Sequence, residues 1–333
     1  MARRPTQRRL YEALLKRFEK DVAEAFMTAI SQARASVNMR DLARAIDAGD
    51  FARALQMLQL DQARLFVLTE AVRQAYIAGG QSVAQVLPGA VGIFAFDGSQ
   101  PRAAAWISQH GGDLVQGIAA DTQDMLQAVL RDGVDTGRSG AAVARDITGK
   151  AHPATGRREG GFLGLTTQQT DAAIRARAQL TALDASYFDR KLRDRRFDPM
   201  VRKAIASGTP LSAADIETIT MRYRDRMAGY RGRMIARNEA HTALSMGQRE
   251  GFQQIIDAGR VQGVLKRWQW NDAGQDARED HRAMSSMPAI PFDRPFTMGD
   301  GTQMQGPHDP AGGAKHSIGC RCIAVYRVIV PER

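Results

Sequence analysis

Apolar side chains recur every four residues through the first thirty positions of this chain. The members of this stripe are Leu10, Leu14, Phe18, Val22, Phe26 and Ile30. Because four residues are close to one helical turn, the spacing places them along one face of a long α-helix. Aromatic residues make up only 6% of the chain, whereas Ala, Gln, Met and Arg are frequent, as is usual in helical proteins. The sequence therefore predicts a mainly helical fold.

The chain is long enough for more than one domain, since 333 residues with 44% hydrophobic content can bury a sizeable core. We expect a basic helical N-terminal region over residues 1–95 and a helical middle domain over 96–259, both elongated. A segment rich in Gly and charged residues predicts an exposed loop near 148–164. Residues 260–333 form the predicted third part, a small C-terminal α+β domain.

The C-terminal part contains two segments typical of β-strands. They are Val264 to Trp270 and Cys322 to Val330, and the second is apolar on both faces and rich in β-branched residues. A strand that is apolar on both faces must be covered by other elements. We therefore expect these two strands to pair, with the long connecting segment folding over them.

The formal net charge of +10 favours an acidic partner such as nucleic acid. Half of this excess lies in residues 1–20, where the candidate contact residues are Arg3, Arg4, Arg8, Arg9, Lys16 and Arg17. These charges suit double-stranded DNA or an acidic protein surface equally well, and they also suit a solvated terminus. Two further basic stretches lie at 190–196 and 222–237. In the second, Tyr223, Met227 and Tyr230 recur at helical spacing and predict a helix with a basic outer face.

Cys320 and Cys322 are the two cysteines of the chain, and on a strand their thiols would point to one face. With His281, and with His308 or His316 as a fourth ligand, they could form a tetrahedral structural zinc site. The alternative is that no cofactor is bound, and that both thiols pack as small hydrophobic groups while His281 forms hydrogen bonds within the loop. A disulfide between residues so close would be strained.

The segment IARNEA places Arg237 and Glu239 two residues apart on a helix, so they do not face each other. We expect Glu239 to pair with an arginine from elsewhere, for which Arg278 is the candidate. Such a pair would attach this helix to the C-terminal module, which also contains Trp270. No segment is typical of a membrane span or a secretory signal, so we expect the protein to be made in a reducing cytoplasm.

Several segments, in order, resemble one known family. They read FDGSQPRAAAWISQHGGDLVQGI, DTQDMLQAVLRDGVDTGRSGAAVARDI, RRFDPMVRKAI, YRGRMIARNEAHTA and then the module with Trp270, Arg278, His281 and CRC. Residues 94–330 in this order are similar to the minor head proteins of tailed bacteriophages, the head morphogenesis or Mu F-like family. Asn238 and Gly319 depart from the usual pattern, next to matched residues.

The resemblance implies a structural minor capsid protein of the virion, associated with the portal vertex and involved in head assembly and in the packaging or ejection of DNA. The implied partners are the portal protein and the major capsid or scaffolding protein. A DNA-binding internal head protein is the alternative, followed by an effector enzyme such as an ADP-ribosyl transferase or nuclease. The sequence contains no Gly-rich phosphate loop, HExxH motif or nucleophile elbow, and we expect no enzymatic activity.

Overall fold

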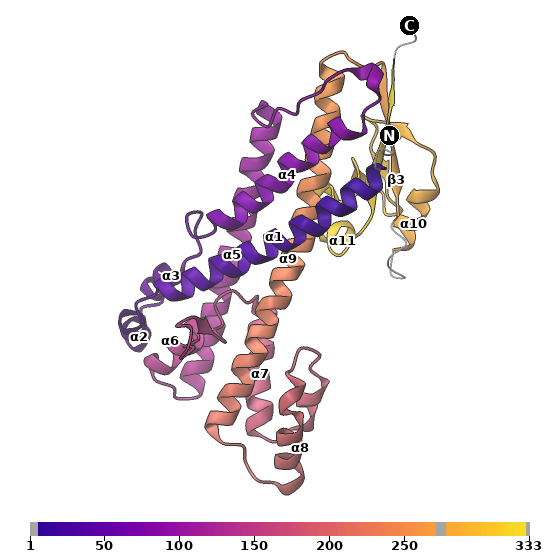
Figure 1. Cartoon of the computed structure of the whole chain (residues 1–333). Helices are drawn as coiled ribbons and strands as arrows, with labels where there is room; N and C mark the ends of the chain where they lie inside the picture. Colours follow the sequence, from indigo (N-terminus) through magenta and orange to yellow (C-terminus); the bar gives the residue numbers. More distant parts are fainter. Residues whose placement is uncertain (1–5, 271–277, 331–333) are drawn as a thin grey trace. The chain divides into compact units, whose positions relative to one another are not determined.

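The computed structural model describes residues 6–270 and 278–330 (Figure 1). Within these ranges it contains eleven α-helices and seven short strands, so the predicted mainly helical fold with a small C-terminal α+β part is confirmed. No helix in the described ranges is both long and apolar enough to cross a membrane. The chain divides into two compact units, which differ from the three consecutive parts that we expected.

Unit 1 combines three segments of the chain: Met1–Ala25, Leu68–Gly111 and Arg233–Arg333. Its helices come from the first part of α1 (Gln7–Ser36), most of α4 (Phe66–Val86), the first part of α5 (Pro101–Asp135), the second part of α9 (Ala213–Asp257), α10 (Glu279–Ser286) and α11 (Gly313–Ser317). Its strands are β3 (Gly263–Gln269), β4 (Ile290–Pro291), β5 (Phe296–Thr297), β6 (Gln303–Met304) and β7 (Ile323–Ile329). Short 3-10 turns lie at Gly89–Val91 and Pro310–Gly312.

The predicted strand pair forms the centre of a three-stranded antiparallel sheet in the order β4-β3-β7. Strands β3 and β7 pair along their whole length, from Gly263 opposite Ile329 to Gln269 opposite Ile323. One side chain of β3, Lys266, is fully buried, and its ammonium group donates hydrogen bonds of 2.8 Å to the backbone and side-chain oxygens of Gln305. Burial lowers the pKa of Lys266 to about 7, and the nearby charge of Arg249 adds to this effect.

Helices α4 and α9 contact each other closely in unit 1 because glycines stand where they meet. A Cβ atom on Gly79 of α4 would collide with the carbonyl oxygen of Leu244, and one on Gly247 of α9 would collide with that of Tyr76. Only glycine permits such a close approach of two helix backbones. Helix α9 begins after Ser212, whose hydroxyl accepts from the amide of Asp215 at 3.1 Å.

Unit 2 consists of Phe26–Val67 and Gly112–Gly232. Besides the remaining parts of α1, α5 and α9, it contains α2 (Met39–Asp47), α3 (Phe51–Leu58), α6 (Gly140–Thr148), α7 (Thr167–Thr181), α8 (Asp198–Ser207) and the two-residue strands β1 (Lys150–Ala151) and β2 (Arg158–Glu159). Two 3-10 turns, η2 (Ala185–Asp189) and η3 (Arg195–Phe197), precede α8. A capping box of Thr166 and Gln169 begins α7.

The loop expected to be exposed near 148–164 is exposed mainly in its middle part, over residues 150–157. Residues 160–164 are buried because arginines from two helices bind their carbonyl oxygens. Arg34 donates to Gly161 at 2.8 Å and to Leu163 at 2.7 Å, and Arg231 donates to Gly164 at 3.0 Å. Since buried carbonyl groups need hydrogen-bond partners, these arginines allow the glycine-rich segment to enter the core.

The buried carboxylate of Asp146 lies beside three arginines in the same unit. It accepts from Arg177 at 2.9 Å and from Arg138, and Arg224 lies 3.5 Å away. Burial alone would raise the pKa of Asp146, but the arginines outweigh this effect and hold it below its usual range. Glu217 also binds Arg177 and Arg224, at 2.8 and 3.2 Å, so Asp146 is the buried one of two carboxylates in this network.

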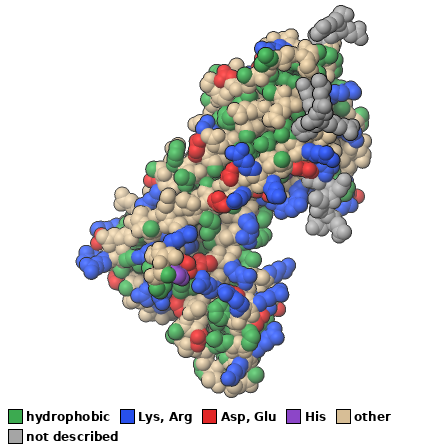
Figure 2. Space-filling view, in the orientation of Figure 1, with side chains coloured by type: hydrophobic (Ala, Val, Ile, Leu, Met, Phe, Trp, Pro, Cys, Tyr) green, Lys and Arg blue, Asp and Glu red, His purple; other side chains and the backbone are tan. Residues whose placement is uncertain are grey.

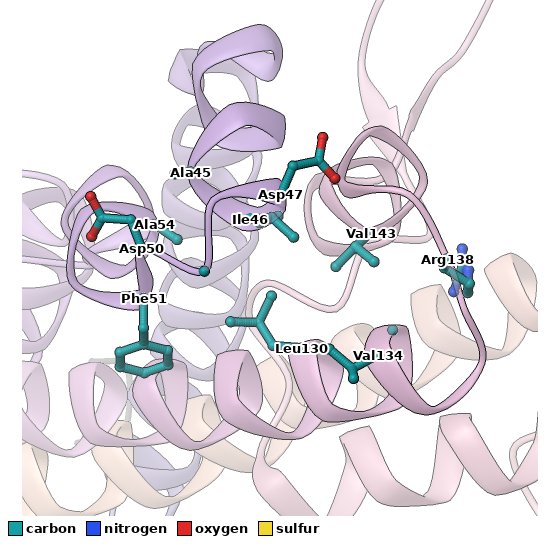
Figure 3. Close-up of a pocket in the computed structure, with 12 residues that line it drawn as sticks. Ala45, Ile46, Asp47, Asp50, Phe51, Ala54, Leu130, Val134, Arg138 and Val143 are labelled. Carbon is teal, nitrogen blue, oxygen red and sulfur yellow. The ribbon is translucent and has the colours of Figure 1, made fainter.

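A hollow of about 270 Å³ lies in unit 2 beside the end of α2 (Figure 3). Figure 3 shows Leu130 and Val143 facing each other across it. The carboxylates at its rim are already used, because Asp47 accepts from the amide of Gly140 at 2.6 Å and Asp50 caps α3. The hollow is thus mainly an apolar gap in the packing of helices.

Replacing Asp146 by Asn should destabilise unit 2 by about 3–5 kcal/mol, since the arginines would lose their buried counter-charge. Urea unfolding followed by circular dichroism measures this change, and Asp113→Asn, at an exposed site in the same unit, is the matched control. A loss below about 1 kcal/mol for Asp146→Asn would contradict the central role of this carboxylate.

Folding stability should rise with pH between about 7 and about 10.4, the ordinary pKa of lysine, because the unfolded chain then binds the Lys266 proton and the folded chain does not. Below pH 7 both states are protonated, so the penalty for burying the charge is complete there. Urea unfolding at several pH values measures the slope, which Lys266→Met should reduce. The exposed Lys203→Met should keep the original slope, and an unchanged slope in Lys266→Met would contradict the interpretation.

Candidate metal centre

The structure brings His281, Cys320 and Cys322 together in unit 1. His281 lies on the short helix α10, and both cysteines lie in the extended residues immediately before β7. The Nδ1 atom of His281 is 3.4 Å from the Sγ atom of Cys320 and 3.7 Å from that of Cys322. Both cysteines are free thiols. These three ligand atoms lie close enough together to hold one metal ion.

The cluster is enclosed by the core of the C-terminal segment. His281, Cys320 and Cys322 are 1%, 4% and 2% exposed. The Trp268 ring meets the His281 ring edge to face, with 5.2 Å between their centroids, and Trp268 packs in turn against Phe296. Polar ligand atoms are therefore gathered within an apolar surrounding, where an ion would be screened little by water.

The two thiols affect each other's pKa. The interaction with the Cys322 side chain holds the pKa of Cys320 well below its usual range, although burial opposes this effect. The same interaction raises the pKa of Cys322. The direction for Cys320 favours its thiolate, which is the form of cysteine that binds metal ions.

A second group of ligand atoms lies on the other side of the His281 ring. His281 Nε2 is 3.4 Å from Nδ1 of His316, which is also 3.4 Å from a carboxylate oxygen of Asp280. The Nε2 atom of His316 lies 3.1 Å from Asp300. Asp280, His281 and His316 could themselves hold a metal ion. Thiolates bind soft and borderline ions more strongly than this nitrogen and oxygen set, so we favour the cysteine side.

If an ion is bound on the cysteine side, the side chains of Asp300 and His316 orient His281 through successive hydrogen bonds. In the tautomer that this role requires, His316 would donate from Nε2 to Asp300, and its Nδ1 would accept from Nε2–H of His281. This arrangement leaves the lone pair on Nδ1 of His281 directed toward the two sulfurs. A ligand histidine is commonly held by a carboxylate in this way, and such partners raise metal affinity.

Neither of the expected fourth ligands joins the two thiols. His308 is within hydrogen-bonding distance of the carbonyl oxygen of Cys320, at 3.0 Å, and its ring stacks on His241. His316 faces the opposite nitrogen of His281, as described above. The prediction of a four-ligand shell completed by either histidine is therefore wrong, and the described residues bring together three ligand atoms.

The expected pair between Glu239 and Arg278 is also wrong. Glu239 instead lies 2.6 Å from Nε2 of His110, whose ring stacks on Trp106, and Arg278 donates to the carbonyl oxygen of Ile318 at 2.7 Å. Trp106 and His110 were not among the predicted site residues, although their spacing of four residues on one helix places them on the same face.

The other two members of the expected network also lie apart from Glu239. Trp270 is half-buried beside β3, where its amide donates to Ser285 and the guanidinium of Arg282 lies over its ring. Arg237 is half-buried, and it forms no ion pair with the parts of the chain that the structure describes.

Four of the six candidate contact residues at the N-terminus lie in the described part of the chain. Arg8 pairs with Glu12 at 2.9 Å and Arg17 with Asp21 at 3.6 Å, each one helical turn further along α1. Arg9 is exposed. Lys16 is exposed as well, whereas Arg3 and Arg4 lie outside the described residues. The positive charge that α1 presents is therefore smaller than the sequence alone indicates.

Comparisons of the chain with protein-family models, with curated protein sequences and with solved structures find no match. The resemblance to phage minor head proteins stays a prediction.

Replacing Asp300 by Ala should weaken the binding of a divalent transition metal ion about 10- to 100-fold, because His281 would lose the chain of groups that orients it. Competition with a chromophoric chelator measures the affinity. Asp293→Ala, at an exposed position in the same segment, is the matched control. Equal affinities for Asp300→Ala and the unchanged protein would show that this chain of groups does not serve the metal centre.

Proposed function

We propose that this chain is a structural minor head protein of a tailed bacteriophage, acting at the portal vertex, and that zinc stabilises its C-terminal part. The order of the motifs over residues 94–330 supports the first half of the proposal. The observation that carries the structural role is the burial of His281, Cys320 and Cys322, each under 5% exposed. A substrate has no access to groups enclosed in this way, whereas a structural metal ion needs such enclosure.

Zinc suits this set of ligands for chemical reasons. Two cysteine sulfurs and one histidine nitrogen are three of the four ligands that structural zinc sites use, and zinc has no redox chemistry that would damage neighbouring thiols. His281 on α10 and the cysteines before β7 are about forty residues apart in sequence. One ion would therefore crosslink both ends of the segment that covers the sheet, which restricts the unfolded chain.

The proposed partners are the portal protein and the major capsid or scaffolding protein, with the chain assembled in the host cytoplasm and retained in the virion head. Exposed Arg9 and Lys16 on α1 suit an acidic surface on such a partner. The same two cations favour the second candidate, a DNA-binding internal head protein. An effector enzyme has less support, because Glu239 is engaged by His110 and is nearly buried.

Procapsids and emptied heads of the phage that encodes this chain should both contain it in a few copies. Quantitative mass spectrometry of purified particles measures its amount in each. Its presence in procapsids supports a role in assembly, and its loss from emptied heads would indicate that it leaves with the DNA. Absence from both kinds of particle would contradict the proposal.

Variants separate assembly from catalysis. His281→Ala should reduce solubility or incorporation into procapsids, because it removes a ligand from the core of unit 1. Asp293→Ala, on the surface of the same segment, should be incorporated normally. A His281→Ala protein that is incorporated at the normal level but blocks infection would favour an enzyme instead.

A further inference from the structure

Two basic stretches that are separate in the sequence meet on one surface of unit 2. They surround a hollow of about 760 Å³, which we name the arginine groove. Its basic lining residues are Lys191, Arg193, Arg195, Arg196, Arg222 and Arg226. Figure 2 shows Lys and Arg side chains gathered over this part of the chain, near α7 and α8. The first four residues lie before or in η3, and the last two lie on α9.

The two acidic lining residues are occupied by contacts within the protein. Asp194 is nearly buried and binds Arg196 through both carboxylate oxygens, at 3.0 and 2.6 Å. Asp225 accepts from the backbone amide of Gly160 at 2.6 Å. With six basic residues and two acidic ones, the lining has a formal excess of four positive charges. This excess favours a polyanion as the ligand.

Five cations of the arginine groove remain accessible to a ligand, whereas the side chain of Arg193 is 12% exposed and pairs with Asp198 at 3.0 Å. The side chain of Arg196 is 77% exposed and that of Arg226 is 51% exposed. Lys191 and Arg195 are exposed too, and neither forms an ion pair with the described residues. The charges of Lys191 and Arg195 are therefore not neutralised by any described residue.

Neighbouring groups also fix the direction of the guanidinium planes. Arg226 donates to the carbonyl oxygen of Arg193 at 2.7 Å, and Arg222 binds Glu159 at 3.1 Å. Each guanidinium has five N–H donors, so several remain for a ligand. A planar fork held in place loses little entropy when it binds a phosphate through two hydrogen bonds.

The composition of the lining indicates which polyanion fits. None of the described lining residues is aromatic, so the arginine groove offers no surface on which unpaired bases could stack. Arginine and lysine that contact phosphates position a duplex without reading its sequence. We propose that the arginine groove binds the phosphate backbone of double-stranded nucleic acid, independently of base sequence.

The test is fluorescence anisotropy of the full-length protein with a labelled DNA duplex of arbitrary sequence, at 50 and 200 mM salt. The variant Lys191→Gln/Arg195→Gln removes two exposed cations that form no ion pair with the described residues. Two lost phosphate contacts lower the salt exponent by about 1.8, so the fourfold rise in salt should cost the variant about tenfold less affinity than the unchanged protein. The variant should also bind more weakly at 50 mM salt.

Arg53→Gln/Arg157→Gln, which removes two exposed cations elsewhere in unit 2, is the matched control and should bind like the unchanged protein. Arg9→Gln/Lys16→Gln tests the competing contact on α1. Equal affinity and salt dependence for Lys191→Gln/Arg195→Gln and the control would overturn the proposal, and so would loss of binding in the α1 variant alone.

Competition identifies the class of partner. Poly-glutamate at the same charge concentration should displace the duplex poorly, because carboxylates along a flexible chain do not match phosphates fixed along a duplex. Displacement as effective as that by unlabelled duplex would overturn the assignment in favour of an acidic protein surface. These measurements use the purified chain, so their result is distinguishable from that of particle localisation.

Discussion

The position of His281 between two thiols and a second histidine is the constraint on which the C-terminal part of unit 1 depends. Its Nδ1 atom lies beside the sulfurs of Cys320 and Cys322. Its Nε2 atom lies beside His316, which in turn contacts carboxylates. Burying so many polar groups costs free energy unless each has a partner. A bound cation would satisfy the sulfurs and the nitrogen together, and would fasten α10 to the residues that begin β7.

The regular elements could be predicted because their signals are local. The stripe from Leu10 to Ile30 and the β-branched residues after Cys322 each reflect interactions within a few residues. The pairing of β3 with β7 could be predicted too, because the backbone N–H and C=O groups of each strand need hydrogen-bond partners. The division into two discontinuous units could not be predicted in this way, because it depends on contacts between segments far apart in sequence.

Contacts of charged groups were predicted less well, for a physical reason. A long side chain can reach any of several partners, and only the packing of the backbone decides which one is near. Glu239 meets His110 and not Arg278 for this reason. The same holds for the arginines that bind the carbonyl oxygens of residues 160–164, which come from distant parts of the chain. It also holds for Asp300 and His316, which contact each other beside His281. The close pair of cysteines with His281 was recognisable, because few residue types form soft metal sites.

The most direct test of the metal centre is X-ray absorption spectroscopy of the purified protein loaded with one equivalent of zinc. We expect two sulfur neighbours at about 2.3 Å and at least one nitrogen at about 2.0–2.1 Å. The sulfur signal should disappear in a Cys320→Ser/Cys322→Ser variant. A zinc ion surrounded only by oxygen and nitrogen in the unchanged protein, or failure to retain zinc at all, would contradict the account.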